Sequence, residues 1–452
     1  MKLLSIVLMA ALFSSLFSSF KPAPKSSNSS SPAPEGFVRV EGTKFTINGE
    51  PYRFVGTNFW YGMHLGVPQQ QERLLKELDK LQEIGCNNLR IMVGSEGPGG
   101  EKYRVQPPLM QKPFQYDEDI LKGLDFLLAE MAKRDLYGVM VLGNFWHWSG
   151  GFSQYLSWLD GTPIPYPSLD GGPSWGIFMD YTFRFYSSPR AKNWFKAHIK
   201  KIVERTNSVT NTPYKEDPTI MAWQLANEPK SGARVGAYRN WIRQTAKFIR
   251  KMDPHHLIST GSEGIMSESL FGNRRKNFIK NHTGEIDYLT AHIWIQNWGW
   301  YDPHKPATLE TSQKKAVAYM EKHIEIAQAM NMPVVLEEFG IARDKESYSA
   351  KDPVTYRDSY YKFIFDYLAQ KIDEDTPFQG ANFWAWGGEG RPRVPRSVYK
   401  VGDDLIGDPP HEYQGWYSVY NNDVTTHKVI ADFNKKYNLK SAMTGEVKNK
   451  EE

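Results

Sequence analysis

The chain has 452 residues, a formal net charge of +4, and an aromatic content of 14%. This length can bury a large core and suits either one α/β barrel or two smaller domains. The small positive charge is not gathered into a lysine or arginine tract, so the composition argues against a nucleic-acid-binding protein.

The N-terminal segment has the composition of an export signal. Residues 1–20 contain one early lysine, followed by an apolar run from Leu3 to Phe17 that only serines interrupt. A run of this length matches a signal peptide and is too short for stable membrane insertion. Residues 21–36 are rich in Ser and Pro, which predicts a linker, because this composition cannot bury a core.

The single cysteine, Cys86, excludes an intrachain disulfide. It lies between an apolar helical segment and the next strand, where a buried, unreactive thiol is expected and a reactive thiol is the alternative. Export without disulfides suggests a protein that is secreted or held in a bacterial cell envelope, in the periplasm or at the cell surface.

From residue 37 the chain alternates between strand and helix patterns. Residues 37–54 surround Asn48-Gly49, a two-residue turn signature that predicts a β-hairpin acting as a small cap. Strands are then expected at 53–57, 88–93, 138–142, 220–226, 257–260, 288–292, 334–338 and 381–384. Helices are expected at 74–84, 120–131, 190–206, 238–252, 311–330 and 355–373.

Eight short strands mostly separated by helices are typical of a (β/α)8 TIM barrel. The polar, mixed segment 265–283 leaves the fifth and sixth units less well defined. Long loops follow strand three (145–189) and strand eight (386–424), and their Gly, Pro, Trp and Tyr content predicts ordered walls of a cleft. We expect one barrel domain over residues 37–440 and a charged tail over 441–452.

Polar and aromatic side chains follow the expected strands. The C-terminal ends of barrel strands converge on one cavity, so these side chains should meet there. They are Asn58, Trp60, Arg90, Asn144, Trp146, Asn227, Glu228, Glu263, His292, Trp294, Glu338 and Trp384. Two carboxylates in one cavity can cleave a glycosidic bond, one protonating the leaving oxygen while the other attacks the anomeric carbon. The 14 tryptophans fit this chemistry, since an indole face suits the apolar face of a sugar ring.

The residue patterns leave several alternatives open. Each glutamate could be a solvated loop residue, Arg90 a structural ion-pair arginine, and His292 a buried histidine with satisfied hydrogen bonds. Glu337 competes with Glu338, because neighbouring strand residues face opposite sides and only one of the two should point inward. Histidines and acids around 282–292 invite a metal site, but they lack the usual ligand spacing.

Five stretches occur in an order that resembles glycoside hydrolase family 5 over residues 37–440. They are Asn-Leu-Arg90-Ile, Leu-Ala-Asn227-Glu228-Pro, His292-Ile-Trp294, Leu-Glu-Glu338-Phe-Gly and Asn-Phe-Trp384-Ala-Trp. Three further stretches, at 144–151, 260–264 and 407–415, resemble the bacterial endo-β-1,4-mannanases of subfamily 7.

The resemblance implies roles for the two carboxylates. Glu228 matches the acid/base, and Glu338, directly before Phe-Gly, matches the nucleophile. In a retaining enzyme their carboxyl groups lie about 5–5.5 Å apart. Arg90 matches the arginine that hydrogen-bonds the nucleophile, and such a cation should hold Glu338 ionised while Glu228 keeps its proton.

The resemblance also implies the substrate-binding set. Asn227 matches the amide that binds the sugar 2-hydroxyl, His292 the histidine of strand six, and Trp384 the platform beneath the sugar. The family often has a tyrosine hydroxyl on the nucleophile where this chain has Trp294, which lacks that hydroxyl. The remaining substrate-binding residues expected at the strand ends are Trp60, Asn144, Trp146 and Glu263.

The implied activity is that of a retaining endo-β-1,4-mannanase. Its expected partners are mannan, glucomannan, galactomannan and manno-oligosaccharides, and it should act as a monomer without cofactor or metal. An endo-β-1,4-glucanase or xyloglucanase on the same machinery is one alternative. A cell-envelope glycan-binding protein that has lost catalysis is another, although binding alone needs no opposed acid and nucleophile.

Overall fold

The computed structural model describes residues 34–167, 171–269 and 272–437. Its main sheet has eight parallel strands in the order β10-β9-β8-β5-β4-β13-β12-β11. The strands are β4 (Phe54–Asn58), β5 (Asn88–Met92), β8 (Tyr137–Val141), β9 (Ile220–Gln224), β10 (Leu257–Ser259), β11 (Leu289–Ile293), β12 (Val334–Phe339) and β13 (Phe378–Phe383). The ends of this ladder are joined where the Asp287 N–H donates to the Ile258 carbonyl oxygen at 2.8 Å. The sheet is therefore nearly closed, which confirms the predicted TIM barrel and its eight strands.

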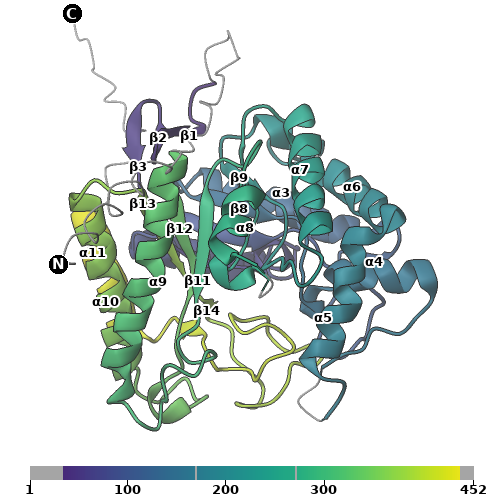
Figure 1. Cartoon of the computed structure of the whole chain (residues 1–452). Helices are drawn as coiled ribbons and strands as arrows, with labels where there is room; N and C mark the ends of the chain where they lie inside the picture. Colours follow the sequence, from purple (N-terminus) through teal and green to yellow (C-terminus); the bar gives the residue numbers. More distant parts are fainter. Residues whose placement is uncertain (1–33, 168–170, 270–271, 438–452) are drawn as a thin grey trace, which may run out of the picture. The chain divides into compact units, whose positions relative to one another are not determined.

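Helices surround the sheet. They are α1 (Gly62–Leu65), α2 (Gln71–Glu83), α3 (Glu118–Ala132), α4 (Gly151–Asp160), α5 (Trp175–Phe183), α6 (Pro189–Val203), α7 (Val235–Met252), α8 (Arg274–Asn281), α9 (Thr308–Met330), α10 (Thr355–Asp373) and α11 (Val424–Tyr437). Figure 1 shows α9, α10 and α11 along one side of the barrel and α4 to α7 along the other. The predicted helices are confirmed, whereas α1 and α11 were not expected. The polar segment 265–283 contains the short helix α8, whose start is capped by the Asn273 side chain.

A three-stranded antiparallel sheet covers one end of the barrel: β1 (Val38–Glu41), β2 (Lys44–Ile47) and β3 (Glu50–Tyr52). The predicted Asn48-Gly49 turn joins β2 to β3, and both residues have the positive φ that this turn requires. Phe45 packs on Phe54 and on Tyr288, at the start of the barrel strands. The predicted cap is confirmed, with one strand more than a hairpin.

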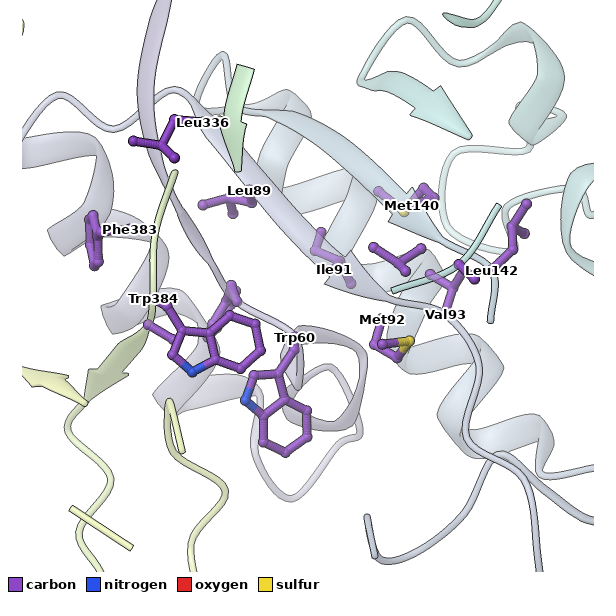
Figure 2. Close-up of a cluster of buried hydrophobic side chains, with 14 of the residues drawn as sticks. Trp60, Leu89, Ile91, Met92, Val93, Met140, Leu142, Leu336, Phe383 and Trp384 are labelled. Atoms are coloured by element: carbon purple, nitrogen blue, oxygen red, sulfur yellow. The ribbon is translucent and has the colours of Figure 1, made fainter. Parts of the chain in front are cut away.

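Side chains of the barrel strands alternate between two environments. On β5, Leu89 and Ile91 belong to the apolar cluster that packs between strands and helices (Figure 2). Asn88 and Arg90 are equally buried but make hydrogen bonds across the barrel, such as that between Asn88 and Asn382 at 3.0 Å. The period of two therefore gives an apolar outer layer and a polar barrel interior. Figure 2 also shows Trp60 and Trp384 at one end of this cluster.

The two long loops contain more regular structure than expected. Segment 145–189 carries α4 and α5, the latter capped by the Ser174 side chain. Segment 386–424 carries a short parallel pair, β14 (Trp386–Gly388) and β15 (Val419–Tyr420). An unpredicted hairpin, β6 (Met110–Lys112) and β7 (Gln115–Tyr116), follows β5. Figure 1 shows α5 and β14 at the end of the barrel opposite β1–β3.

Some sequence predictions fall outside the described residues. These are the signal segment 1–20, most of the linker 21–36, and the charged tail 441–452. Within the described ranges, none of the helices combines the length and apolar character needed to cross a bilayer. Cys86 is 2% exposed, and burial raises the pKa of its thiol, which confirms the predicted buried, unreactive cysteine.

Candidate active site

Arg90, on β5, organises the polar network at the C-terminal ends of the strands. Its guanidinium is 3% exposed and donates to the Gln224 Oε1 at 2.8 Å, the Asn58 Oδ1 at 2.9 Å and the Asn227 Oδ1 at 2.8 Å. Its Nη1 also donates a short hydrogen bond to the Glu338 Oε1. One buried cation therefore positions a carboxylate and three amides from the ends of three strands, β4, β9 and β12.

Glu337 and Glu338 both reach Arg90. The pairing of β11 with β12 shifts by one residue, since Ala291 lies opposite Leu336 while His292 lies opposite Glu338. The Glu337 carboxylate lies 3.6 Å from the Arg90 Nε and accepts from Gln224 at 2.8 Å. The expectation that strand alternation would leave only one of the two glutamates inside is therefore wrong, because a β-bulge breaks the alternation here.

Glu228 lies beyond the end of β9 in a left-handed backbone conformation, with φ of +46°. This conformation is uncommon for a residue with a side chain and is found at functional sites. The Glu228 N–H donates to the Gly261 carbonyl oxygen at 2.9 Å. Gly261 itself has φ of +74°, and a Cβ there would come within 2.0 Å of the Ala226 carbonyl oxygen, so only glycine fits this close approach.

His292 lies between the two carboxylates that the sequence singled out. Its Nδ1 lies 2.7 Å from the Glu228 Oε1 and 3.3 Å from the Glu338 Oε2. The other Glu228 oxygen, Oε2, accepts from the Trp146 Nε1 at 2.7 Å. One ligand atom from each of Glu228, His292 and Glu338 lies within 4.8 Å of the others. The fold thus brings together side chains that are far apart in the sequence.

The three ionisable groups, Glu228, Glu338 and His292, shift one another's pKa values. Burial would raise the pKa of Glu228, but the hydrogen bond from His292 and the charge of Lys230 lower that pKa to about 2. Burial raises the pKa of Glu338 to about 7, against the opposing charges of His292 and Arg90. Burial would lower the pKa of His292, but Glu338 and Glu228 raise it to about 9. The directions of these shifts favour a protonated His292 beside an ionised Glu228, whereas the resemblance implied that Glu228 keeps its proton.

The same three groups are the ones that could hold a metal ion by geometry. A divalent cation placed among them would lie beside the Arg90 guanidinium, which contacts Glu338, and the two positive charges would repel one another. Carboxylate and imidazole atoms of this group also take part in hydrogen bonds between Glu228 and His292 and between Glu228 and Trp146. An acid–base site is therefore the interpretation that accounts for all of these contacts.

Asn227 and Asn144 link neighbouring strand ends. The Asn227 Nδ2 donates to the Asn144 Oδ1 at 3.3 Å. Asn144 is completely buried, donates to the Ser149 Oγ at 3.0 Å and accepts from the Trp146 N–H at 3.0 Å. These contacts orient the Trp146 backbone, and so hold the indole that bonds Glu228.

The tryptophans of the predicted set occupy different positions. Trp294 packs edge-on against Trp384 at a centroid distance of 5.8 Å and lies 5.5 Å from Tyr417. The Tyr417 hydroxyl donates to Asn297, so it does not replace the tyrosine hydroxyl that Trp294 lacks. Trp60 is 3% exposed, and its Nε1 donates to the Gly407 carbonyl oxygen at 2.9 Å, which ties the loop after β13 to the rim.

Several residues of the site escaped the sequence analysis. Lys230 forms a short ion pair with the predicted Glu263 and lies over the Trp146 ring at 5.3 Å. Its place two residues after Glu228 could have indicated it, whereas nothing local pointed to Trp175, whose ring meets Trp146 edge-on at 5.4 Å. His411 was passed over inside a stretch that was noted only for its resemblance.

The loops after the third and eighth barrel strands meet beside Glu228. The His411 ring lies 5.3 Å from the His147 ring and 6.1 Å from the Trp175 ring. It is also parallel to the Trp148 ring at 6.4 Å. The two loops therefore form one continuous wall next to Glu228. The sequence predicted a wall for each loop, but not that the two would meet.

Comparisons with known proteins show which family the chain resembles. A family model described as GH family 5 beta-mannosidase-like matches residues 35–442. The chain is 30% identical to mannan endo-1,4-beta-mannosidase 1 of Solanum lycopersicum over 325 residues, covering 68% of this chain and 75% of that protein. It is 28% identical to putative mannan endo-1,4-beta-mannosidase 4 of Arabidopsis thaliana, covering 84% of this chain and 88% of that protein. The crystal structure of a glycoside hydrolase family 5 mannosidase from Rhizomucor miehei is similar, with 39% identity, a TM-score of 0.81, and coverage of 88% of this chain and 97% of that chain.

Proposed function

The chain belongs to the β-mannosidase-like proteins of glycoside hydrolase family 5 and is a glycoside hydrolase, and we propose that it hydrolyses β-1,4-mannosidic bonds with retention of configuration. The observation that carries this proposal is the placement of Glu228 and Glu338, each with an oxygen within 4.8 Å of the other. Retaining enzymes place their carboxyl groups about 5–5.5 Å apart, whereas inverting enzymes need about 6.5–9.5 Å to admit a water molecule. The short separation favours double displacement.

In the first step Glu338 attacks the anomeric carbon, and Glu228 gives a proton to the glycosidic oxygen, which leaves as a hydroxyl group. The product is a covalent mannosyl ester of Glu338. In the second step Glu228 takes a proton from water, the water oxygen bonds the anomeric carbon, and the ester bond to Glu338 breaks. The Arg90 guanidinium on Glu338 stabilises the carboxylate that must attack and later leave.

His292 is the neighbour from which Glu228 can take the proton that it needs. The His292 Nδ1 lies 2.7 Å from the Glu228 Oε1, and the pKa of His292 is raised while that of Glu228 is lowered. Transfer along this hydrogen bond yields a protonated Glu228 and a neutral His292 without exchange with solvent. Substrate binding favours the transfer, because a bound sugar removes water from Glu228 and makes its ionised form less stable.

The substrate class follows from the relatives and from the sequence motifs. Relatives named mannan endo-1,4-beta-mannosidases, and a Rhizomucor miehei mannosidase solved as a mutant with mannosyl-fructose, support a mannose-based substrate. The motifs at 144–151, 260–264 and 407–415 resemble subfamily 7 and favour internal cleavage of mannan, glucomannan and galactomannan. Asn227 would bind the 2-hydroxyl, and Trp384 would stack beneath the sugar.

Release of mannose units from chain ends is a second candidate, favoured by one observation. The contact of His411 with His147 and Trp175 closes the rim beside Glu228, and a groove closed on one side suits the end of a chain. The Rhizomucor miehei relative is also named a mannosidase.

The product profile from unbranched mannan tests these alternatives together. Internal cleavage releases a mixture of oligosaccharides and lowers viscosity early, whereas end cleavage releases short products at nearly constant viscosity. Parallel incubation with carboxymethylcellulose and xyloglucan tests the β-glucan alternatives. Mannan binding without any product after long incubation would support a glycan-binding protein and overturn the proposal. Addition of EDTA should leave the rate unchanged, because the mechanism uses no metal.

We also propose export of the protein, on the composition of residues 1–20, and action as a monomer. Cell fractionation and size-exclusion chromatography would test these two points.

A further inference from the structure

Three neighbouring helices on the outside of the barrel carry only positive charges. Together α6, α7 and α8 contain 14 Lys and Arg and no Asp or Glu. Without these 14, the 55 Lys and Arg of the chain fall to 41 against 51 Asp and Glu, so the remainder has a net charge of −10. In the structure α6 packs on α7 and α7 on α8, and Figure 1 shows α6 beside α7. The positive charges therefore lie together on one side of the molecule.

The charges on α7 form a stripe along the helix. The stripe consists of residues at intervals of four, about 6 Å apart along the axis, which places them on one face: Arg239, Arg243, Lys247 and Lys251. The last three are exposed, and within the described chain the only α7 side chain in an ion pair is Arg250. Like charges at this spacing repel one another and lower the stability of a helix.

The same spacing recurs on the two helices that pack on α7. On α6 the residues at intervals of four are Lys192, Lys196 and Lys200, and on α8 they are Lys276 and Lys280. Burial and the charge of Lys196 lower the pKa of Lys192, so these like charges lie close enough to repel. Repulsion along all three helices is a cost that the fold itself does not require.

Helices elsewhere on the barrel use this spacing for attraction. Each of α9, α10 and α11 pairs an exposed lysine with an acid four residues away, at 2.7, 2.6 and 2.6 Å: Glu310 with Lys314, Lys362 with Asp366, and Lys428 with Asp432. Such pairs stabilise a helix and keep a surface soluble at the same time. Solubility therefore does not explain why α6, α7 and α8 lack acids, and binding of an anionic partner does.

Two surface hollows at the ends of α6 add to the positive surface. The first has a volume of about 380 Å³ and the second of about 500 Å³. In each hollow three basic side chains accompany a single acid: Arg184, Arg190 and Arg234 with Asp160 in the first, and Lys200, Lys201 and Arg205 with Glu204 in the second. Each hollow therefore has a net positive charge and can receive an acidic group of a ligand.

The surface offers charge without apolar contact. Among the described residues of α6, α7 and α8, no large hydrophobic side chain is exposed. Single-stranded nucleic acids stack their bases on exposed aromatic rings, and helices that bind membrane surfaces insert apolar side chains, so neither partner finds its usual contacts here. A hydrophilic polymer with many carboxylates needs no such contacts, because it binds by charge and by release of its counterions.

We propose that α6, α7 and α8 form a binding surface for an acidic polysaccharide, a polymer whose sugar units carry carboxylate groups. The mannan of the proposed function is uncharged, so this surface holds the enzyme to acidic material around its substrate and takes no part in hydrolysis. The choice of a polysaccharide over a nucleic acid rests on the proposed export of the protein.

The test measures binding of the full-length protein to polygalacturonate by calorimetric titration at about 50 and 200 mM NaCl, a range over which charge-driven binding weakens strongly. The α7 variant combines Arg243→Gln, Lys247→Gln and Lys251→Gln. The control variant removes the same number of charges from the ion pairs of α9, α10 and α11, by Lys314→Gln, Lys362→Gln and Lys428→Gln. Thermal unfolding and kinetics on mannopentaose show whether each variant is folded with an intact active site.

The α7 variant should bind polygalacturonate about 10-fold to 100-fold more weakly than the wild type at the lower salt concentration, and its affinity should depend less steeply on salt. The control variant should bind within about twofold of the wild type. Both variants should keep the wild-type kcat/KM on mannopentaose. Polygalacturonate should raise the unfolding temperature of the wild type more than that of the α7 variant, because it binds the folded state.

Absence of binding by the wild type would overturn the inference, as would unchanged binding by the folded α7 variant. An equal loss in both variants would also overturn it, because net charge and not this surface would then govern binding. Tighter binding to duplex DNA or to phosphatidylglycerol vesicles than to polygalacturonate would overturn the choice of partner.

If the α7 variant fails to fold, Lys276→Gln combined with Lys280→Gln on α8 supplies the same comparison. Inactivity of the wild type on mannan would refute the proposed function instead. That result is separate from these measurements, because binding to polygalacturonate is measured without hydrolysis.

Discussion

The β1–β3 end of the barrel and its catalytic end are built from the same eight strands, yet the side chains buried at the first end are apolar and many of those buried at the second are ionisable. Beneath β1–β3, a small apolar cluster including Phe45, Phe54 and Tyr288 closes the barrel. At the other end, Arg90, Glu338 and their partners form a buried ionic network. Apolar burial stabilises the fold, whereas burial of several ionisable groups costs stability and is retained where chemistry needs it. The comparison therefore predicts that substitutions at the two ends affect different measurements.

The largest expected effect is on activity at the catalytic end. Glu338→Ala and Glu228→Ala should each lower kcat on mannan by roughly 10^4-fold, because each removes a covalent or proton-transfer role. The unfolding temperature of each variant should change little, because the loss of repulsion between the buried carboxylates offsets the loss of contacts made by the removed side chain. Added azide should restore product as an α-mannosyl azide in Glu338→Ala protein. Near-full activity of purified Glu338→Ala protein would remove the mechanism.

Next in size is a loss of stability at the opposite end. Phe45→Ala should lower the free energy of unfolding by about 3–5 kcal/mol, because it leaves a cavity between Phe54 and Tyr288. The kcat of the folded fraction should stay within about twofold of the wild type. Urea unfolding and kinetics below the unfolding transition measure both quantities. A large drop in kcat at unchanged stability would show that the two ends are coupled.

A smaller effect, with a definite pH signature, is expected at His292. Wild-type kcat/KM should fall as the pH drops through about 7, since burial raises the pKa of Glu338 to about 7 and Glu338 must be ionised to attack. The imidazolium of His292 opposes that shift, so His292→Asn should raise the pKa of Glu338 further and move the acidic limb to higher pH. The maximal rate should fall about 100-fold, because Glu228 loses its proton source. His304→Asn, at an exposed histidine, is the control and should leave the pH profile unchanged. If the acidic limb of the kcat/KM profile does not move in His292→Asn protein, the proposed interaction of His292 with the two carboxylates is contradicted.

The smallest expected effect tests one hydrogen bond. Trp146→Phe removes the Nε1–H donor to the Glu228 Oε2 and keeps most of the aromatic surface. We expect kcat/KM on mannan to fall by about tenfold, equivalent to about 1.4 kcal/mol. Trp158→Phe, on the partly buried face of α4, is the matched control. Equal rates for the two variants would mean that the indole nitrogen does not orient Glu228.

Much of the site was predictable because barrel strands obey a period of two and end on one rim. An apolar strand followed by Asn227-Glu228-Pro229, and another followed by Phe339-Gly340, place carboxylates at that rim whatever the details of packing. The resemblance to family 5 then assigned Arg90, His292 and Trp384. Each of these inferences depended on residues within a few positions of one another.

The sequence by itself determined the barrel, the positions of its eight strands and the cap, because local periodicity carries that information, whereas the choice of Glu338 over Glu337 came from the resemblance to family 5. Only the tertiary structure decided that Glu337 and Glu338 both reach Arg90, since a register shift against β11 leaves no local mark in the sequence. It also decided that the His292 Nδ1 lies 2.7 Å from Glu228 and 3.3 Å from Glu338, which shifts the pKa values of all three groups. These features depend on burial and on distances between segments remote in the chain, and such quantities exist only once the barrel has closed.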